Sequence, residues 1–124
     1  MILTGHEIIK EVLNGKINIS PFTEDNVTTN SYDVSLGDTL IRYTDEVIDP
    51  KKRPNYELIK IPKDGFLIEK NSFFLGSTFE EIGSNNYVPI LNAKSGTARS
   101  GLFVLITADL IDIGSVGNMT LQVY

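Results

Sequence analysis

One helical segment followed by many short apolar segments is the pattern that most constrains the fold of this chain. Thr4 is placed to cap a helix, and Glu7 follows three residues later, as in a capping box. Gly15 is placed to end that helix. Between them runs an apolar stripe at helical spacing, which consists of Ile8, Ile9, Val12 and Leu13. After Gly15 the segments shorten, so we expect a mainly β protein with a short N-terminal helix, folded as a barrel or a distorted sandwich.

The segments after Gly15 are predicted to be strands because they are short, apolar or alternating, and bounded by turn residues. The predicted strands are Leu40 to Tyr43, Leu58 to Ile61, Phe66 to Glu69, Phe73 to Thr78, a fully buried Leu102 to Ile111, and Met119 to Tyr124. Val88 to Ala93 is expected to be extended, and Pro89 favours an edge position. The basic stretch between Asp45 and Asn55 is interpreted as an exposed loop. In the last strand, alternation places Gln122 on one face with Thr120 and Tyr124.

Length and composition fit a single domain that spans residues 1–124. Of its residues, 41% are hydrophobic and 22% are charged, a balance that supports a buried core and argues against disorder. No apolar run approaches the ~20 residues that a membrane span needs. Met1 to Glu7 lacks the basic and apolar regions of a signal peptide. We therefore expect a protein of the cytoplasm with no membrane partner.

The chain contains no cysteine and one histidine, His6. Disulfide bonds, thiol catalysis and thiolate zinc sites are excluded on that ground. Zinc-dependent nucleobase deaminases are excluded as well, because they need a His/Cys/Cys or Cys₃ ligand set. His6 is interpreted as a solvated residue of the first helical turn. Any deaminase with this sequence must activate water without zinc.

The formal net charge of −5 limits the class of partner. An acidic surface repels the phosphate backbone of DNA and RNA, so we expect no nucleic-acid partner. A small polyanion such as a nucleoside triphosphate can still bind where cations are concentrated locally. It would arrive with Mg²⁺, which offsets part of its charge.

The segment from Lys94 to Arg99 is the candidate phosphate-binding loop. It combines two cations with the hydroxyls of Ser95 and Thr97 around Gly96. Backbone N–H groups beside a glycine can approach phosphate closely, and hydroxyls donate to phosphate oxygens. Arginine adds a planar bidentate fork. A polar turn between two strands uses the same residue types, so the segment alone leaves both interpretations open.

Asp112 is the second candidate, because it follows an apolar segment and precedes Gly114 and Gly117. An acidic residue at that point fits a tight turn that presents a carboxylate. The alternative is an Asx turn, in which Asp112 bonds to its own backbone. Asp109 is interpreted as a solvated neighbour.

Together these segments resemble the dCTP deaminase and dUTPase superfamily, and more specifically its deaminase branch. The resemblance covers nearly the whole chain and rests on the order and spacing of several segments. They are Met1 to Thr4 with the first helix, Pro21-Phe22, Asn30 to Gly37, Phe74 to Glu80, Lys94 to Arg99, Ile111 to Gly114, and Thr120 to Gln122. The family acts in nucleotide-pool control, which fits a bacterial or phage-infected cell.

The resemblance implies a dUTPase-like distorted β-barrel of the β-clip type, assembled as a homotrimer with nucleotide sites between subunits. It implies a zinc-independent hydrolase that converts dCTP to dUTP and takes dCTP, dUTP or dTTP as ligands. Gln122, Ser95 and Arg99 fall on the catalytic positions, and Asp112 on the aspartate that holds the deoxyribose 3′-hydroxyl. The nucleotide-binding positions correspond to Lys94, Ser95, Gly96, Thr97, Ala98, Arg99, Thr107, Ala108, Asp112, Thr120, Leu121 and Gln122.

Three residues depart from the family pattern. Lys94 stands where an arginine is usual, which keeps the charge but loses bidentate geometry. Gly96 replaces a serine and removes one hydroxyl donor. Gln122 replaces the glutamate that activates the attacking water and protonates the leaving ammonia. An amide cannot take up a proton at neutral pH, so we expect this chain to deaminate dCTP slowly or not at all.

Gln122 leaves three interpretations of function open. It is an engineered replacement in an ordinary deaminase, a natural change in a homologue that binds nucleotides without turnover, or the mark of a shifted activity. That shifted activity would be hydrolysis of dUTP to dUMP with Asp112 and a metal-bound triphosphate. A structural trimer that binds no nucleotide is the remaining contrast.

The resemblance also predicts that the chain is C-terminally truncated. The family continues past Tyr124 with further strands and with a tail that closes over the triphosphate. An end at Tyr124 would leave a strand edge unpaired, and exposed edges pair readily with other chains. We therefore expect a partner, a symmetry mate or further residues to cover that edge.

Overall fold

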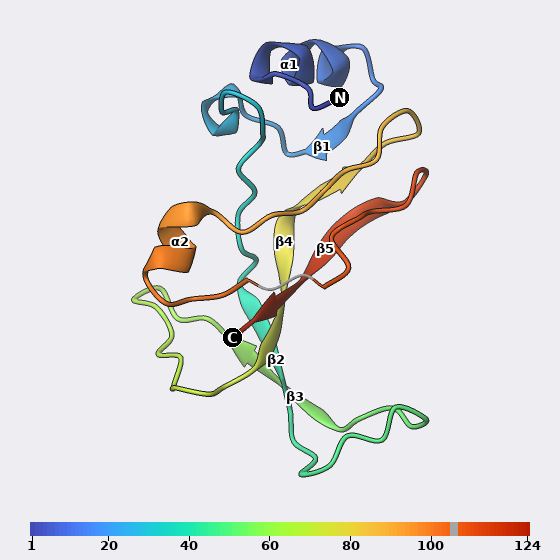
Figure 1. Ribbon diagram of the computed structural model, residues 1–124. Helices are drawn as coiled ribbons and strands as arrows, with labels where there is room; N and C mark the ends of the chain where they lie inside the picture. The colour runs from blue at the N-terminus through green and yellow to red at the C-terminus, as the bar shows by residue number, and fades with distance from the viewer. Residues whose placement is uncertain (105–106) are drawn as a thin grey trace.

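The computed structural model of the protein describes residues 1–104 and 107–124 and shows a leading helix followed by an open antiparallel sheet (Figure 1). In these ranges the sheet has five strands. The elements in chain order are α1 (Gly5–Leu13), β1 (Asn18–Ser20), the 3₁₀ turn η1 (Glu24–Asn26), β2 (Thr39–Tyr43), β3 (Tyr56–Lys60), β4 (Phe74–Gly83), α2 (Ser95–Arg99) and β5 (Val116–Val123). The predicted mainly β class with a short leading helix is confirmed, and the open sheet is consistent with a dUTPase-like fold.

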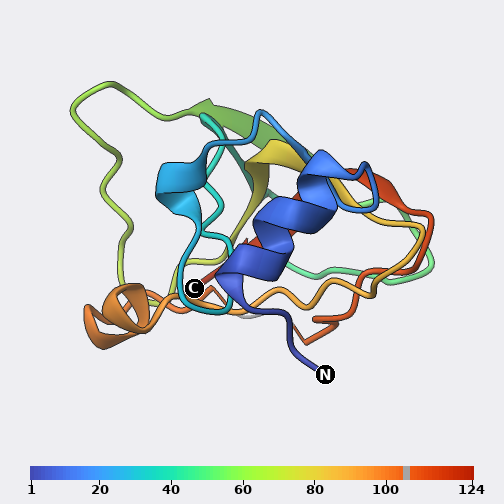
Figure 2. The same cartoon turned by 90° about the horizontal axis from the view of Figure 1, so that it is seen from above.

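Strand β4 is the centre of the sheet, because it pairs with β1, β2 and β5. The order is β1-β4-β2-β3, with β5 also paired to β4. Figure 1 shows β1 and α1 at one end of the molecule and the β2–β3 hairpin at the other. Seen from above, α1 lies over the sheet (Figure 2). The long central strand therefore connects the two ends of the fold.

Helix α1 begins and ends where the sequence predicts. The Thr4 hydroxyl accepts a hydrogen bond from the Glu7 N–H at 3.4 Å, and Gly15 adopts a φ of 70° just past the helix. The buried face is not the predicted apolar stripe, because Leu13 is 77% exposed. A Cβ at Gly5 would lie 2.1 Å from the Thr28 carbonyl oxygen. This close approach fixes the rotation of the helix and turns Gly5, Ile8 and Glu11 inward.

The buried carboxylate of Glu11 fastens α1 to the chain beyond β4. It accepts hydrogen bonds from the Tyr87 hydroxyl at 2.7 Å and from the Asn14 amide at 3.3 Å. The Lys16 ammonium lies 3.1 Å from the same carboxylate. The Tyr87 hydrogen bond, followed by the Lys16 contact, lowers the pKa of Glu11, and the Glu11 contact raises the pKa of Tyr87. A buried charge is tolerated here because each of these donors stabilises it.

A bulge between Ser77 and Glu81 interrupts the pairing of β4 with β5. The buried Thr78 hydroxyl donates to the Glu80 carbonyl at 2.7 Å and accepts from the Met119 N–H at 2.8 Å. On the facing strand, the side-chain amide of Asn118 donates to the Thr78 carbonyl at 3.0 Å. These bonds occupy backbone groups that an interrupted ladder would leave unsatisfied, and they thereby fix the register on both sides of the bulge.

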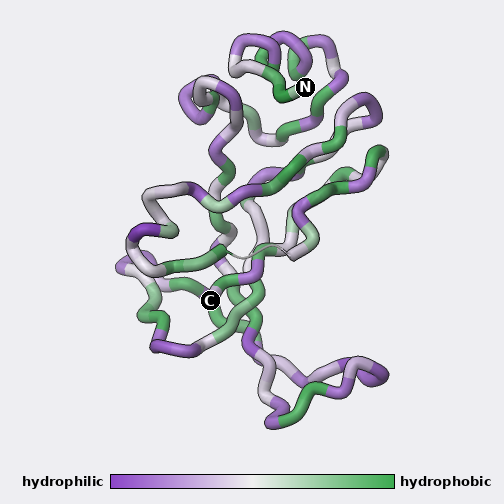
Figure 3. The backbone as a smooth tube through the Cα atoms, viewed as in Figure 1, coloured by the Kyte–Doolittle hydropathy of each residue, from purple (hydrophilic) through white to green (hydrophobic). Residues whose placement is uncertain are grey.

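The core lies against the Phe74 end of β4. Leu40, Phe74, Leu121 and Val123 are its buried members. Figure 3 shows a largely hydrophilic loop between β2 and β3, at the predicted exposed loop, and more apolar chain along the sheet.

Two predicted strands are wrong. Residues 66–69 form no strand. Phe66 is apolar for another reason, because its ring packs edge-on against the ring of Phe74, with 5.6 Å between the ring centroids. The Leu102 to Ile111 segment is not a buried strand in its described part: it makes isolated bridges at Val104 and Leu110, and Leu110 is 62% exposed. Residues 105–106 of that prediction lie outside the described residues. No helix in the described ranges is long and apolar enough to cross a membrane.

Replacing Thr78 with valine keeps the size of the side chain but removes the acceptor of the Met119 N–H. We expect the free energy of unfolding to fall by about 1–3 kcal/mol, the typical cost of a buried unsatisfied polar group. Urea unfolding followed by circular dichroism measures the loss. Thr120→Val, at an exposed position of β5, is the matched control. An equal change in both variants would contradict the role of Thr78.

The Glu11 cluster predicts a pH dependence of stability. The pKa of Glu11 in the fold lies below its ordinary value of 4.5, so its charge stabilises the fold above that value. This contribution is lost as the pH falls through the folded pKa, below 4.5. The stability advantage of wild type over Glu11→Gln should therefore shrink between about pH 5 and about pH 3. Urea midpoints across this range test it, and a constant difference would show that Glu11 is not responsible.

Candidate functional site

The predicted phosphate-binding segment forms the short helix α2, so the prediction that it is a loop is wrong. Lys94 is its N-cap residue, and the Ala98 N–H donates to the Lys94 carbonyl at 3.0 Å. The turn is closed by the Ser100 hydroxyl, which donates to the Thr97 carbonyl at 2.7 Å. Ser95 and Arg99 are exposed and lie one helical turn apart, so they share a face of α2. The helix thereby gathers one hydroxyl and one guanidinium on a single surface.

A cavity of about 690 Å³ adjoins α2, and its volume is typical of small-molecule sites. Most of its lining is apolar and comes from the side chains around the core, including Leu121 and Val123. Its polar lining residues are Ser31, Asp33, Asn92, Lys94, Ser95 and Thr97. Four of the predicted nucleotide-binding residues, Lys94, Ser95, Thr97 and Leu121, therefore border one hollow.

The Lys94 ammonium is paired with the carboxylate of Asp33, which lines the same cavity. An anion that binds Lys94 would compete with this carboxylate for the ammonium. The two side chains are 68% and 36% exposed, and exposed ion pairs contribute only about 0–1 kcal/mol. The exchange therefore costs little. Sequence reasoning missed Asp33, although it lies in the Asn30 to Gly37 stretch that carries the family resemblance.

Gln122 lies on the opposite face of β5 from this cavity. It pairs with Leu75 of β4, and Thr120 pairs with Ser77. Directly paired residues share a face, and neighbours along a strand alternate. Gln122 is half-buried on the face of Thr120, as predicted, whereas Leu121 is buried and borders the cavity. A single chain thus directs its amide and its phosphate-binding candidates to different sides.

Asp112 is presented by a tight turn. The Ser115 N–H donates to the Asp112 carbonyl at 3.1 Å, and Gly114 adopts a φ of 87°, the left-handed conformation that a type II turn requires. The carboxylate is exposed, and within the described ranges it accepts no hydrogen bond from its own backbone. The turn expected from the sequence is present without the Asx contact. Asp112 is not among the residues that line the cavity beside α2.

The remaining candidate residues do not line the cavity beside α2. Gly96, Ala98 and Arg99 belong to α2 but do not line the cavity. Thr107 and Ala108 form an exposed bend directly after the residues that the structure does not describe. Across the described part of the chain, Arg99 forms no ion pair, so its guanidinium is open to an anion. The part of the chain that the structure describes contains no cluster of three or more His, Asp or Glu side chains arranged for a metal ion.

Comparison with known proteins identifies the family to which the chain is similar. Residues 2–124 match the sequence model of a family described as dCTP deaminase-like. A dCTP deaminase, dUMP-forming, of Clostridium beijerinckii is 41% identical over 124 residues, which are 100% of this chain and 71% of the relative. The protein of the same description from Hathewaya histolytica is 40% identical over 124 residues, covering 100% and 72% of the two chains. That of Leptospira biflexa is 40% identical over 123 residues, covering 99% and 70%.

The chain therefore belongs to the dCTP deaminase-like family, and the predicted resemblance is confirmed. It spans about 70% of the length of these relatives. Because the match begins at residue 2 and ends at residue 124, it includes both α2 and the Gln122 strand.

Proposed function

We propose that this chain binds dCTP as its Mg²⁺ complex in a deaminase-type site. Ser95, Arg99 and Lys94 hold the phosphates, Asp112 holds the 3′-hydroxyl, and Gln122 faces the pyrimidine. The observation that carries the proposal is the shared face of α2, where a hydroxyl and an open guanidinium stand together in a family of dCTP deaminases. dUTP and dTTP offer the same phosphates and sugar, so they bind the same site. Mg²⁺ belongs to the substrate complex in this proposal.

The site is completed between copies of the chain. Gln122 lies on the face of β5 that turns away from the cavity bordered by Ser95. One copy therefore supplies the α2 surface and a neighbour supplies the Gln122 face. This division supports the homotrimer that the family resemblance predicts, and it accounts for the absence of Gln122 from the residues that line the cavity beside α2.

The chemistry proposed for this fold is attack of water on C4 of cytosine, with loss of ammonia. A carboxylate at position 122 would take one proton from the attacking water and pass it to N3 of the ring. It would then pass the proton of the new C4 hydroxyl to the amino group, which leaves as ammonia. Such general acid–base catalysis is worth typically about 10²–10⁴-fold. The Gln122 amide can orient a water molecule but cannot take its proton. We therefore propose that the chain as it stands binds dCTP and turns it over slowly.

Two products are proposed for the active form. Deamination alone yields dUTP. The relatives are described as dUMP-forming, which favours a second candidate in which the triphosphate is also cleaved and pyrophosphate leaves. Asp112 is then a candidate to orient the water that attacks the α-phosphate. The two reactions share the release of ammonia and differ in pyrophosphate.

Gln122→Glu should raise the rate of ammonia release from dCTP by about 10²–10⁴-fold, because it restores a titratable group beside the base. Ammonia and pyrophosphate are measured in the same reaction. Ammonia alone indicates dUTP as product, and equal amounts of both indicate dUMP. Gln122→Met keeps the length of the side chain without a carboxylate and is the control. Rapid turnover by wild type, equal to that of Gln122→Glu, would refute the role assigned to position 122.

A mixing experiment tests whether the site is shared between copies. Wild type lacks the carboxylate, and the double variant Arg99→Ala/Gln122→Glu lacks the guanidinium, so each alone should be nearly inactive. Refolded together, they form mixed assemblies in which the carboxylate introduced at position 122 of one copy can meet Arg99 of another, and ammonia release should appear. A mixture as inactive as its components would show that both groups must come from one chain.

A further inference from the structure

Ser84, directly after β4, connects three separate parts of the chain. It is 4% exposed, and its hydroxyl donates to the Lys16 carbonyl at 2.6 Å. The same oxygen accepts the backbone N–H groups of Asn86 and Tyr87, both at 2.9 Å. Its carbonyl accepts the Gly114 N–H at 2.8 Å. One residue thus links the chain after α1, the turn after β4 and the turn that carries Asp112.

A second bond holds the other side of that turn. The Ile111 N–H donates to the Pro89 carbonyl at 3.0 Å. Asp112 therefore lies between two anchored neighbours, Ile111 before it and Gly114 after it. Both are bonded to the same segment, residues 84–89. The placement of the exposed carboxylate depends on where that segment lies.

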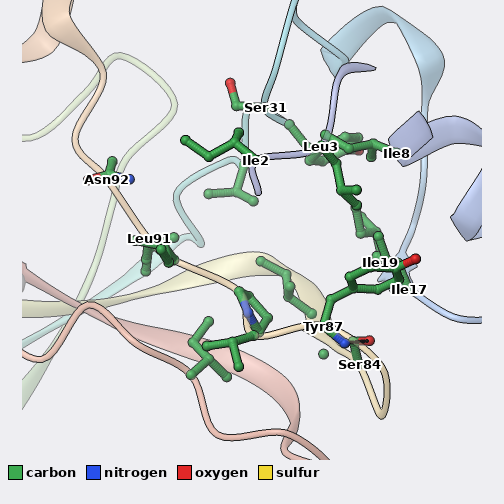
Figure 4. Close-up of a pocket in the computed structure, with 18 of the residues that line it drawn as sticks. Ile2, Leu3, Ile8, Ile17, Ile19, Ser31, Ser84, Tyr87, Leu91 and Asn92 are labelled. Atoms are coloured by element: carbon green, nitrogen blue, oxygen red, sulfur yellow. Dashed lines mark hydrogen bonds between the residues drawn. The ribbon is translucent and has the colours of Figure 1, made fainter. Parts of the chain in front are cut away.

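Tyr87 fixes this segment against α1. Its hydroxyl donates to the buried Glu11 carboxylate at 2.7 Å, which the Lys16 ammonium also contacts. Figure 4 shows Ser84 and Tyr87 beside one another in the lining of a second cavity, with Ile17 and Ile19 next to them. The segment is thus held by one side-chain contact at Tyr87 and one at Ser84, and both lead to the helix end of the molecule.

We infer that Ser84 and Tyr87 are positioning residues for Asp112. They are not among the residues proposed to bind the nucleotide, and they act by holding the segment to which the Asp112 turn is bonded. The inference rests on the proposed function, in which Asp112 binds the 3′-hydroxyl of the sugar. Loosening the segment should weaken recognition of that hydroxyl and leave the phosphate contacts of α2 as they are.

The test compares the affinity of the assembled protein for Mg²⁺-dCTP with its affinity for Mg²⁺-2′,3′-dideoxy-CTP, which lacks the 3′-hydroxyl. Calorimetry is suitable because Gln122 keeps turnover slow. Wild type should prefer dCTP by about 10- to 100-fold, the usual effect of a hydrogen bond to a charged group. Asp112→Ala should abolish the preference. Tyr87→Phe and Ser84→Ala should reduce it at least about threefold, with little change in affinity for the dideoxy analogue.

Tyr56→Phe and Ser72→Ala are the matched controls, because they remove the same groups outside this segment. A general loss of stability would weaken both nucleotides equally, so the ratio of affinities separates positioning from folding. Tyr87→Phe removes a single hydroxyl and keeps the test decisive if Ser84→Ala does not fold. An unchanged ratio in Tyr87→Phe, with the ratio lost in Asp112→Ala, overturns the inference alone. A wild type without any preference overturns the proposed contact of Asp112 and the inference with it.

Discussion

The pairing of β4 with β5 is the constraint on which the arrangement of this protein depends. A shift of one residue between two strands would exchange every side chain between the two faces of the sheet. Here the Thr78 hydroxyl and the Asn118 amide bind the backbone at the bulge, so the register on each side of it is fixed. Leu121 and Val123 consequently close the core, and Gln122 must face the other way.

This alternation places the candidate site residues on two different sides of the sheet. The phosphate-binding candidates belong to α2 and to the cavity on the core side, while the amide belongs to the outer face of the sheet. A protein of this design can be fully folded as one chain and still lack a complete site. Under the proposed function, a neighbouring copy would supply the second group of candidate residues.

The sequence predicts best what is decided locally. Thr4 and Gly15 mark the ends of α1 because capping depends on residues within one helical turn. The strand predictions fail where apolar residues do not belong to a continuous ladder: Phe66 contacts Phe74 from a loop, and Leu110 makes only an isolated bridge and is largely exposed. The Asp33–Lys94 pair could not be predicted from the sequence, because its members are 61 residues apart and only the folded chain brings them together. Local patterns predict Lys94 to Arg99 and Asp112 as candidates, whereas Gln122, Thr107 and Ala108 are predicted only through the order of the family segments.

The ion pair between Asp33 and Lys94 also bears on how the protein behaves at different ionic strengths. Lys94 is already paired with a carboxylate, so in the proposed function a nucleotide phosphate would compete with Asp33 for this lysine. An unpaired lysine would instead attract the nucleotide through a field that dissolved salt screens within about 10 Å at 0.1 M. In the proposed site, the contribution of Lys94 to affinity would therefore depend less on salt concentration than the contribution of the open guanidinium of Arg99.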